Sequence, residues 1–106
     1  MKFILTESQE KLLNLRRRIL SDEYLDHLYE IVIEGFDYSD PCEFDSFGEY
    51  LDEIISGSEQ TFLNSYVEMS DYDKNTQNYL HVYVSDLIRE KYFLRIEEEY
   101  LETECD

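Results

Sequence analysis

Basic residues are missing from the middle of this sequence. Residues 19–73 contain 16 Asp and Glu residues and no Lys or Arg, and the whole chain carries a formal net charge of −17. A surface that only had to be soluble would mix both signs, because mixed charges avoid self-repulsion. The distribution favours an acidic surface that meets a basic partner, with a generally acidic proteome as the plain alternative. It argues against direct binding of nucleic acid, although Arg16, Arg17 and Arg18 form a local basic cluster. We expect that cluster to pair with Asp22, Glu23 or the acidic helices.

Glycine, cysteine and long apolar runs are also scarce. Gly35, Gly48 and Gly57 are the only glycines, so no glycine-rich phosphate loop is present. No apolar run approaches the ~20 residues of a membrane span. The opening MKFILTESQ is too short in its apolar part, and too soon acidic, for a secretory signal. Cys42 and Cys105 could in principle pair, but they lie far apart in the sequence without a Cys-x-x-Cys spacing, which favours two reduced thiols. We therefore expect a cytoplasmic protein that does not enter a membrane.

Apolar residues are nevertheless plentiful enough for folding. They make up 42% of the chain, and aromatic residues make up 15%. These fractions are too high for a chain that stays disordered through lack of hydrophobicity. With 106 residues, the chain has room for one modest core. We expect residues 1–106 to form a single acidic domain.

The first half of the sequence shows helical periodicity. Thr6 and Gln9 fit a capping box, which predicts a helix over about 7–20 that follows a short extended segment. Ser21 is a plausible cap for a second helix that ends before Gly35. The stretch FDYSDPCEFDS then reads as a loop.

A third helix is predicted after that loop. Ser46 can cap this helix, and the apolar residues of the helix continue to Ile55. Gly57 favours a break near 56–58, after which the periodicity restarts. The C-terminal third allows two interpretations: one long helix or two abutting helices from about 76 to 102, or a strand at 79–84 before a helix. We predict a mainly α fold, a small bundle of four or five helices, with an α+β fold as the alternative.

Acidic residues recur at every fourth position in three places. On a helix, residues i and i+4 are neighbours, so like charges at this spacing cost roughly 0.2–0.5 kcal/mol per pair. We name these rows acid ladders: Asp22, Asp26, Glu30 and Glu34; Asp45, Glu49 and Glu53; and Glu98, Glu102 and Asp106. The base-free region predicts a partner-binding surface made of Asp22, Asp26, Glu30, Glu34, Asp37, Asp45, Glu49, Asp52 and Glu53. A solvated helix face is the alternative reading of any single ladder.

Aromatic residues are interleaved with these acids. Uncharged aromatic anchors dominate many protein interfaces, so they are candidates for the same surface. The candidates are Tyr24, Tyr29, Tyr38, Phe44, Phe47 and Tyr50. We expect about half of these six to belong to the core instead.

Metal sites and catalytic groups are weakly supported. Asp71, Asp73 and Asn75 occupy the first, third and fifth positions of a calcium loop, but its glycine and final glutamate are missing, so a turn between helices is expected. The potential zinc ligands show no paired spacing: His27, Cys42, His81 and Cys105. The acids near Cys42 would not activate a thiol nucleophile. We expect no cofactor, no metal and no enzymatic activity.

The opening of the chain resembles known sequences. Lys2 to Gln9, KFILTESQ, followed by Leu12 and Leu13, resembles the start of many small uncharacterised proteins of tailed phages. The resemblance covers about a tenth of the chain and implies no activity and no functional residue. It does imply a context, because phages encode small acidic proteins that imitate nucleic acid and occupy the binding surfaces of host defence proteins.

Charge and context together predict a binding protein. We expect an acidic inhibitor, a phage-encoded nucleic-acid mimic that blocks the basic nucleic-acid-binding surface of a host or defence protein. The alternative is a phage structural or assembly factor whose acidic face docks on a basic viral protein. A second copy of the chain is a further candidate partner.

Overall fold

The computed structural model describes the fold of residues 7–105, which contain four α-helices and two short 3-10 helices but no strand. The prediction of a mainly α bundle is confirmed, and the alternative strand at 79–84 is wrong because those residues lie within one long helix. The predicted extended segment and the Thr6 cap fall outside the described residues. In chain order the elements are α1 (Glu7–Ile19), α2 (Asp22–Tyr38), η1 (Pro41–Glu43), α3 (Phe47–Tyr66), η2 (Met69–Asp71) and α4 (Lys74–Glu102).

Side-chain caps fix the beginnings of three helices. The Ser21 hydroxyl accepts a hydrogen bond from the Tyr24 N–H, as predicted for α2. The predicted Ser46 cap of α3 is also confirmed, because its hydroxyl accepts from the Glu49 N–H at 3.3 Å. Asp73 caps α4, and its carboxylate accepts from the Thr76 N–H at 2.7 Å. These bonds satisfy backbone donors that have no partner within the helix.

Two helices are longer than predicted. α2 continues past Gly35 to Tyr38, and α3 continues through Gly57 to Tyr66 without the predicted break. An interior glycine costs a helix about 1 kcal/mol relative to alanine. In α3 the buried stripe extends on both sides of Gly57, from Ile54 to Phe62, so packing outweighs that cost. Neither glycine adopts a positive φ.

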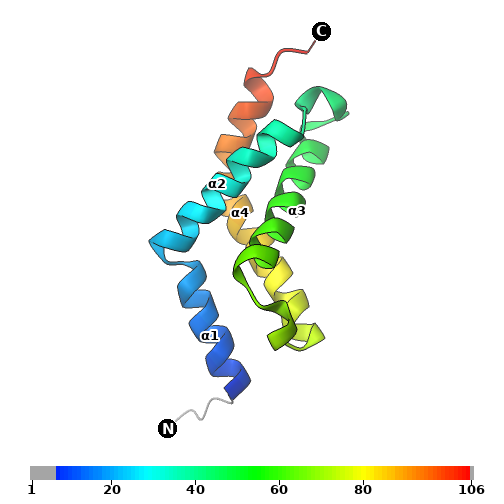
Figure 1. The fold of residues 1–106 in the computed structure, drawn as a ribbon. Coiled ribbons are helices and arrows are strands. Elements are labelled where there is room, and N and C mark those ends of the chain that lie inside the picture. The colour runs from blue at the N-terminus through cyan, green and yellow to red at the C-terminus, as the bar shows by residue number, and fades with distance from the viewer. Residues whose placement is uncertain (1–6, 106) are drawn as a thin grey trace.

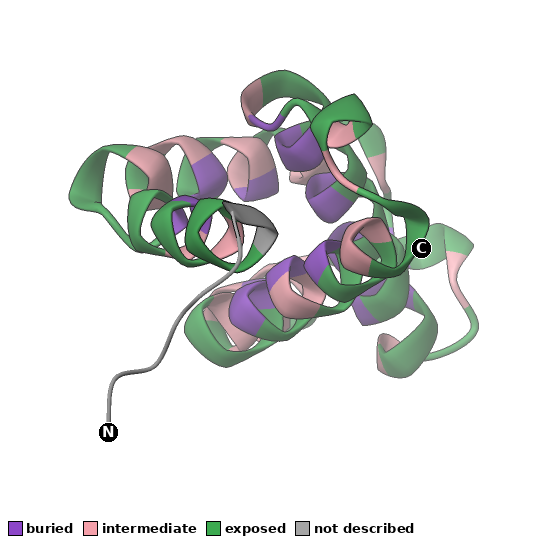
Figure 2. Cartoon of the chain, turned by 90° about the horizontal axis from the view of Figure 1, so that it is seen from below, coloured by how far each residue is buried: buried purple, intermediate pink, exposed green. Residues whose placement is uncertain are grey.

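The core forms around α3, which packs against both α2 and α4 (Figure 1). The buried parts of the helices face the interior of the bundle (Figure 2). α3 supplies the largest share of the buried side chains: Tyr50, Leu51, Ile54, Ile55, Ser58, Glu59, Phe62 and Leu63. None of the helices within residues 7–105 combines the length and the apolar character that crossing a membrane requires.

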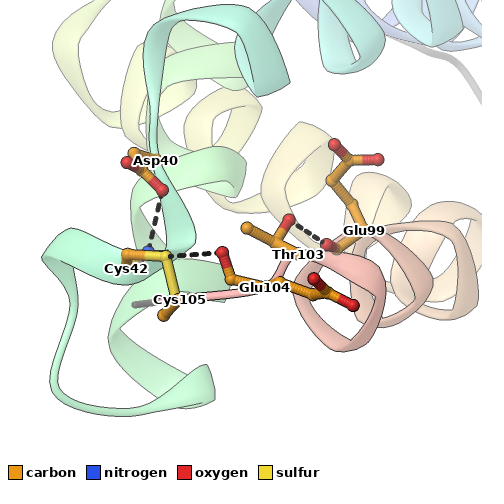
Figure 3. Close-up of a disulfide and its surroundings, with 6 residues drawn as sticks. All are labelled: Asp40, Cys42, Glu99, Thr103, Glu104 and Cys105. Carbon is orange, nitrogen blue, oxygen red and sulfur yellow. Dashed lines mark hydrogen bonds between the residues drawn. A yellow bond between two sulfur atoms is a disulfide. The ribbon is translucent and has the colours of Figure 1, made fainter.

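A disulfide joins Cys42 in η1 to Cys105 after α4 (Figure 3). The expectation of two reduced thiols is therefore wrong. The fold places the two Cα atoms 5.5 Å apart despite a sequence separation of 63. Sequence spacing alone did not indicate that proximity. In the chain-entropy view, a crosslink over a loop of this length stabilises the folded state by about 4 kcal/mol.

Two tyrosine hydroxyls, Tyr50 in the core and Tyr92 packed against it, differ in their hydrogen bonding. The Tyr92 hydroxyl donates to the backbone carbonyl of Leu25 at 3.2 Å. The buried Tyr50 hydroxyl has no hydrogen-bond partner among the described residues. Burial, assisted by the nearby Glu99 carboxylate, raises the pKa of Tyr50 to about 12. Burial also raises the pKa of Tyr92.

We predict that Tyr50→Phe keeps or raises the free energy of unfolding at pH 7, because a buried hydroxyl without a partner costs about 1–3 kcal/mol. Above pH 10, the ordinary tyrosine pKa, the unfolded wild type loses the Tyr50 proton, whereas the folded protein keeps it until about pH 12. Wild-type stability should therefore fall in this interval by about 1.4 kcal/mol per pH unit, and the variant should lack this contribution. Urea unfolding at several pH values measures both effects.

Tyr92→Phe is the matched control. It removes a hydroxyl that has a hydrogen-bond partner, so stability at pH 7 should drop by about 0.5–1.5 kcal/mol. Equal losses at pH 7 for the two variants, or an unchanged alkaline slope in Tyr50→Phe, would contradict the assignment.

Candidate protein-binding surface

The first acid ladder lies on the solvent side of α2. Its buried stripe contains Leu28 and Val32, and helical geometry places the ladder largely opposite this stripe. All four ladder residues are exposed: Asp22, Asp26, Glu30 and Glu34. No ion pair involves any of them within the described part of the chain. The side chains therefore present their charge to solvent, as predicted.

The end of α2 carries further negative charge where the helix disfavours it. Asp37 is exposed and lies in the last turn, which contains no basic residue, and Glu34 directly precedes that turn. A helix C-terminus is the negative end of its dipole, so an anion there is unfavourable by an amount similar to the 0.3–1 kcal/mol that a cation gains. Folding alone does not explain these two acids.

The predicted acids on and before α3 are also exposed, but two of them have structural partners. Glu49 accepts a hydrogen bond from the Asp45 N–H at 3.2 Å, which supports the start of α3. Asp52 lies 3.5 Å from the Arg89 guanidinium, in an exposed ion pair of small energetic value. Glu53 has no ion-pair partner among the residues described. In the second ladder, Glu49 therefore supports the start of α3, whereas Glu53 presents its charge to solvent.

The two ladders meet at a groove between α2 and α3. Its volume is about 310 Å³, and Glu34 from α2 and Glu53 from α3 both line it. Gly35, Gly57 and Tyr38 also line the groove. The structure therefore brings together one predicted acid from each helix. Sequence periodicity predicted their exposure, but only the packing of α2 on α3 creates the groove.

The candidate aromatic anchors divide as expected between core and surface. Tyr50 is fully buried, and Tyr24, Phe44 and Phe47 pack partly buried against the core. Tyr29 and Tyr38 remain accessible, with Tyr38 89% exposed. The exposed Tyr38 ring lies at the rim of the groove, where a partner can contact it.

The basic residues make few contacts with the acid ladders. Arg16 lies over the Tyr83 ring, with its guanidinium carbon 5.0 Å from the ring centroid. The pairing of Arg16, Arg17 and Arg18 with acids is not found among the described residues. Elsewhere, Lys11 pairs with Asp71 at 3.6 Å. The negative charge of α2 is therefore left almost uncompensated.

The other candidate ligands have ordinary structural roles. Asp73 caps α4, and the hydrogen bond from Thr76 holds its carboxyl pKa below the usual value. His27 stacks on Tyr66 with ring centroids 4.7 Å apart. Within residues 7–105, no group of three His, Cys, Asp or Glu side chains is placed to hold a metal ion.

One acid was not recognised from the sequence. Glu59 is only 5% exposed, and its carboxylate contacts the Nδ1 atom of His81 from α4. Buried charges are usually paired, because an unpaired charge in the interior is very costly. A partner 22 residues away gives no local sequence signal.

Comparisons with protein-family models, curated proteins and solved structures find no match to this chain.

We predict that Asp26→Asn, Glu30→Gln and Glu34→Gln together raise the free energy of unfolding by roughly 0.6–1.5 kcal/mol, because three repulsive i,i+4 pairs disappear. Asp22 is left in place because the dipole favours an acid in the first turn of α2. Urea unfolding at low salt measures the change. A fall in the free energy of unfolding would show that the ladder is structural.

Proposed function

We propose that this chain is an acidic inhibitor that imitates nucleic acid and occupies the basic nucleic-acid-binding surface of another protein. The observation that carries the proposal is the exposure of all nine predicted acids, most of them unpaired, on and beside two helices that pack against each other. A basic protein would gain from neutralising this charge, and the fold would lose little, since few of these acids hold it together.

The charge spacing supports the resemblance to nucleic acid. Each i,i+4 step advances about 6 Å along a helix, so one ladder carries about one charge per 6 Å. The N-terminal part of α2 lies beside the C-terminal part of α3, so the two ladders meet only at Glu34 and Glu53. One strand of DNA carries one charge per ~3.4 Å. A ladder has about half that linear density, and its slow rotation, about 40° per step, gives the charges a winding path.

The proposed role is binding and not catalysis. Both cysteines are in the disulfide, which leaves no thiol nucleophile. The alternative role, an assembly factor on a basic viral protein, would use the same surface. No feature of residues 7–105 favours the assembly role over inhibition.

The proposal predicts displacement of DNA. The purified chain is added to a panel of DNA-binding proteins with basic clefts, nucleases among them, each holding a fluorescent duplex. Displacement of the duplex is followed by fluorescence anisotropy. The Asp26→Asn, Glu30→Gln and Glu34→Gln variant should displace at least ~10-fold less effectively, with slower association and a flatter salt dependence.

The matched control changes the same net charge on α4, with Glu90→Gln, Glu98→Gln and Glu102→Gln, which are all exposed acids. This control should displace DNA nearly as well as the wild type. Equal losses in the two variants would show a response to total charge alone. No displacement from any member of the panel, with or without reductant, would contradict the proposed function.

A further inference from the structure

The groove between α2 and α3 has the features of a binding site for one cationic side chain. Its volume of about 310 Å³ lies at the low end of the range for ligand pockets, about 300–1,000 Å³. Ile31 and Ile54 give it apolar walls, and Glu34 and Glu53 contribute one carboxylate from each helix. Such a space suits a long side chain with an apolar stem and a charged end.

The electrostatics of the groove favour a cation. Neither Glu34 nor Glu53 forms an ion pair within the described residues. The groove also lies beside the C-terminal turn of α2, which contributes Tyr38 and whose dipole attracts positive charge. The exposed Tyr38 ring adds a surface on which a cation can stack.

The largely buried Ser58 supplies an independent indication of a ligand. Ser58 lines the groove and is only 4% exposed. Its hydroxyl oxygen faces α2, 3.8 Å from the point where a Cβ on Gly35 would lie. It makes no hydrogen bond to the described residues. The oxygen is not among the fully buried atoms that lack a partner, so it is accessible from the groove and available as an acceptor.

We propose that this groove binds one arginine side chain of a basic partner protein, an inference that rests on the proposed function and specifies how the surface recognises its partner. Arginine fits better than lysine because its planar guanidinium has five donors, which can serve two carboxylates and a hydroxyl at once, and it stacks well on tyrosine. Desolvated arginines in pockets are typical anchors of protein interfaces.

The test uses the three glycines as reporters. Their backbone amides are followed by nuclear magnetic resonance in the intact chain while acetyl-Gly-Arg-Gly-amide is added. Gly35 and Gly57 line the groove, and Gly48 at the start of α3 does not. The amide signals of Gly35 and Gly57 should shift and saturate, whereas the Gly48 signal should stay in place. The uncharged citrulline peptide should cause no shift, and the lysine peptide should bind several-fold more weakly.

A blocking variant separates groove binding from general attraction. A Cβ on Gly57 meets no atom within 4 Å, so Gly57→Leu fills open space and also favours the helix. Gly48→Leu is the matched control, since its Cβ would make only an ordinary contact with Ser46. Gly57→Leu should lower arginine-peptide affinity at least ~10-fold, and Gly48→Leu should not change it. Circular dichroism confirms that both variants remain helical.

The outcomes distinguish this inference from the proposed function. Unmoved Gly35 and Gly57 signals, equal shifts with the citrulline peptide, or full affinity in Gly57→Leu would overturn the arginine groove. The DNA-displacement assay could still succeed in that case, which would leave the inhibitor function intact. Conversely, saturable arginine binding in the groove without displacement of DNA from any protein would refute the proposed inhibition and retain the groove.

Discussion

The packing of α3 against α2 and α4 is the interaction on which the rest of the structure depends. It buries a continuous stripe from Tyr50 to Leu63, and the apolar gain from burial must exceed the repulsion among the acids on the outer sides of the same helices. The packing keeps α2 helical past Gly35 and α3 helical past Gly57. It also brings one acid of each ladder, Glu34 and Glu53, to the groove between the two helices.

The sequence predicted local features well, because local physics determines them. Ser21 and Ser46 cap the helices that follow them. The four-residue spacing from Asp22 to Glu34 places these acids on one face of α2 once that segment is helical. Gly35 and Gly57 misled the prediction, since their weak helix propensity is overridden by contacts with residues far away along the chain. The pairing of Cys42 with Cys105, the burial of Glu59 and the groove depend on tertiary packing, for which one sequence gives no local signal.

Cys42 and Cys105 also bear on where the protein works. Disulfides are rare in reducing compartments, so this bond weighs against the predicted cytoplasmic location. The bond ties the segment between α2 and α3 to the end of α4, and the acid ladders do not take part in it. A surface role for the ladders is therefore compatible with either redox state, provided that the core holds α2 against α3.

The central claim is that the fold leaves the acids of residues 19–73 uncompensated, so that a basic partner can neutralise them. The most direct measurement is the free energy of unfolding in urea as sodium chloride is raised. We predict that it increases, because screening relieves repulsion among many exposed carboxylates and weakens only a few surface pairs, such as Lys11 with Asp71. A free energy of unfolding that falls or stays constant with salt would show that the acids are already balanced within the folded chain, and would contradict the claim.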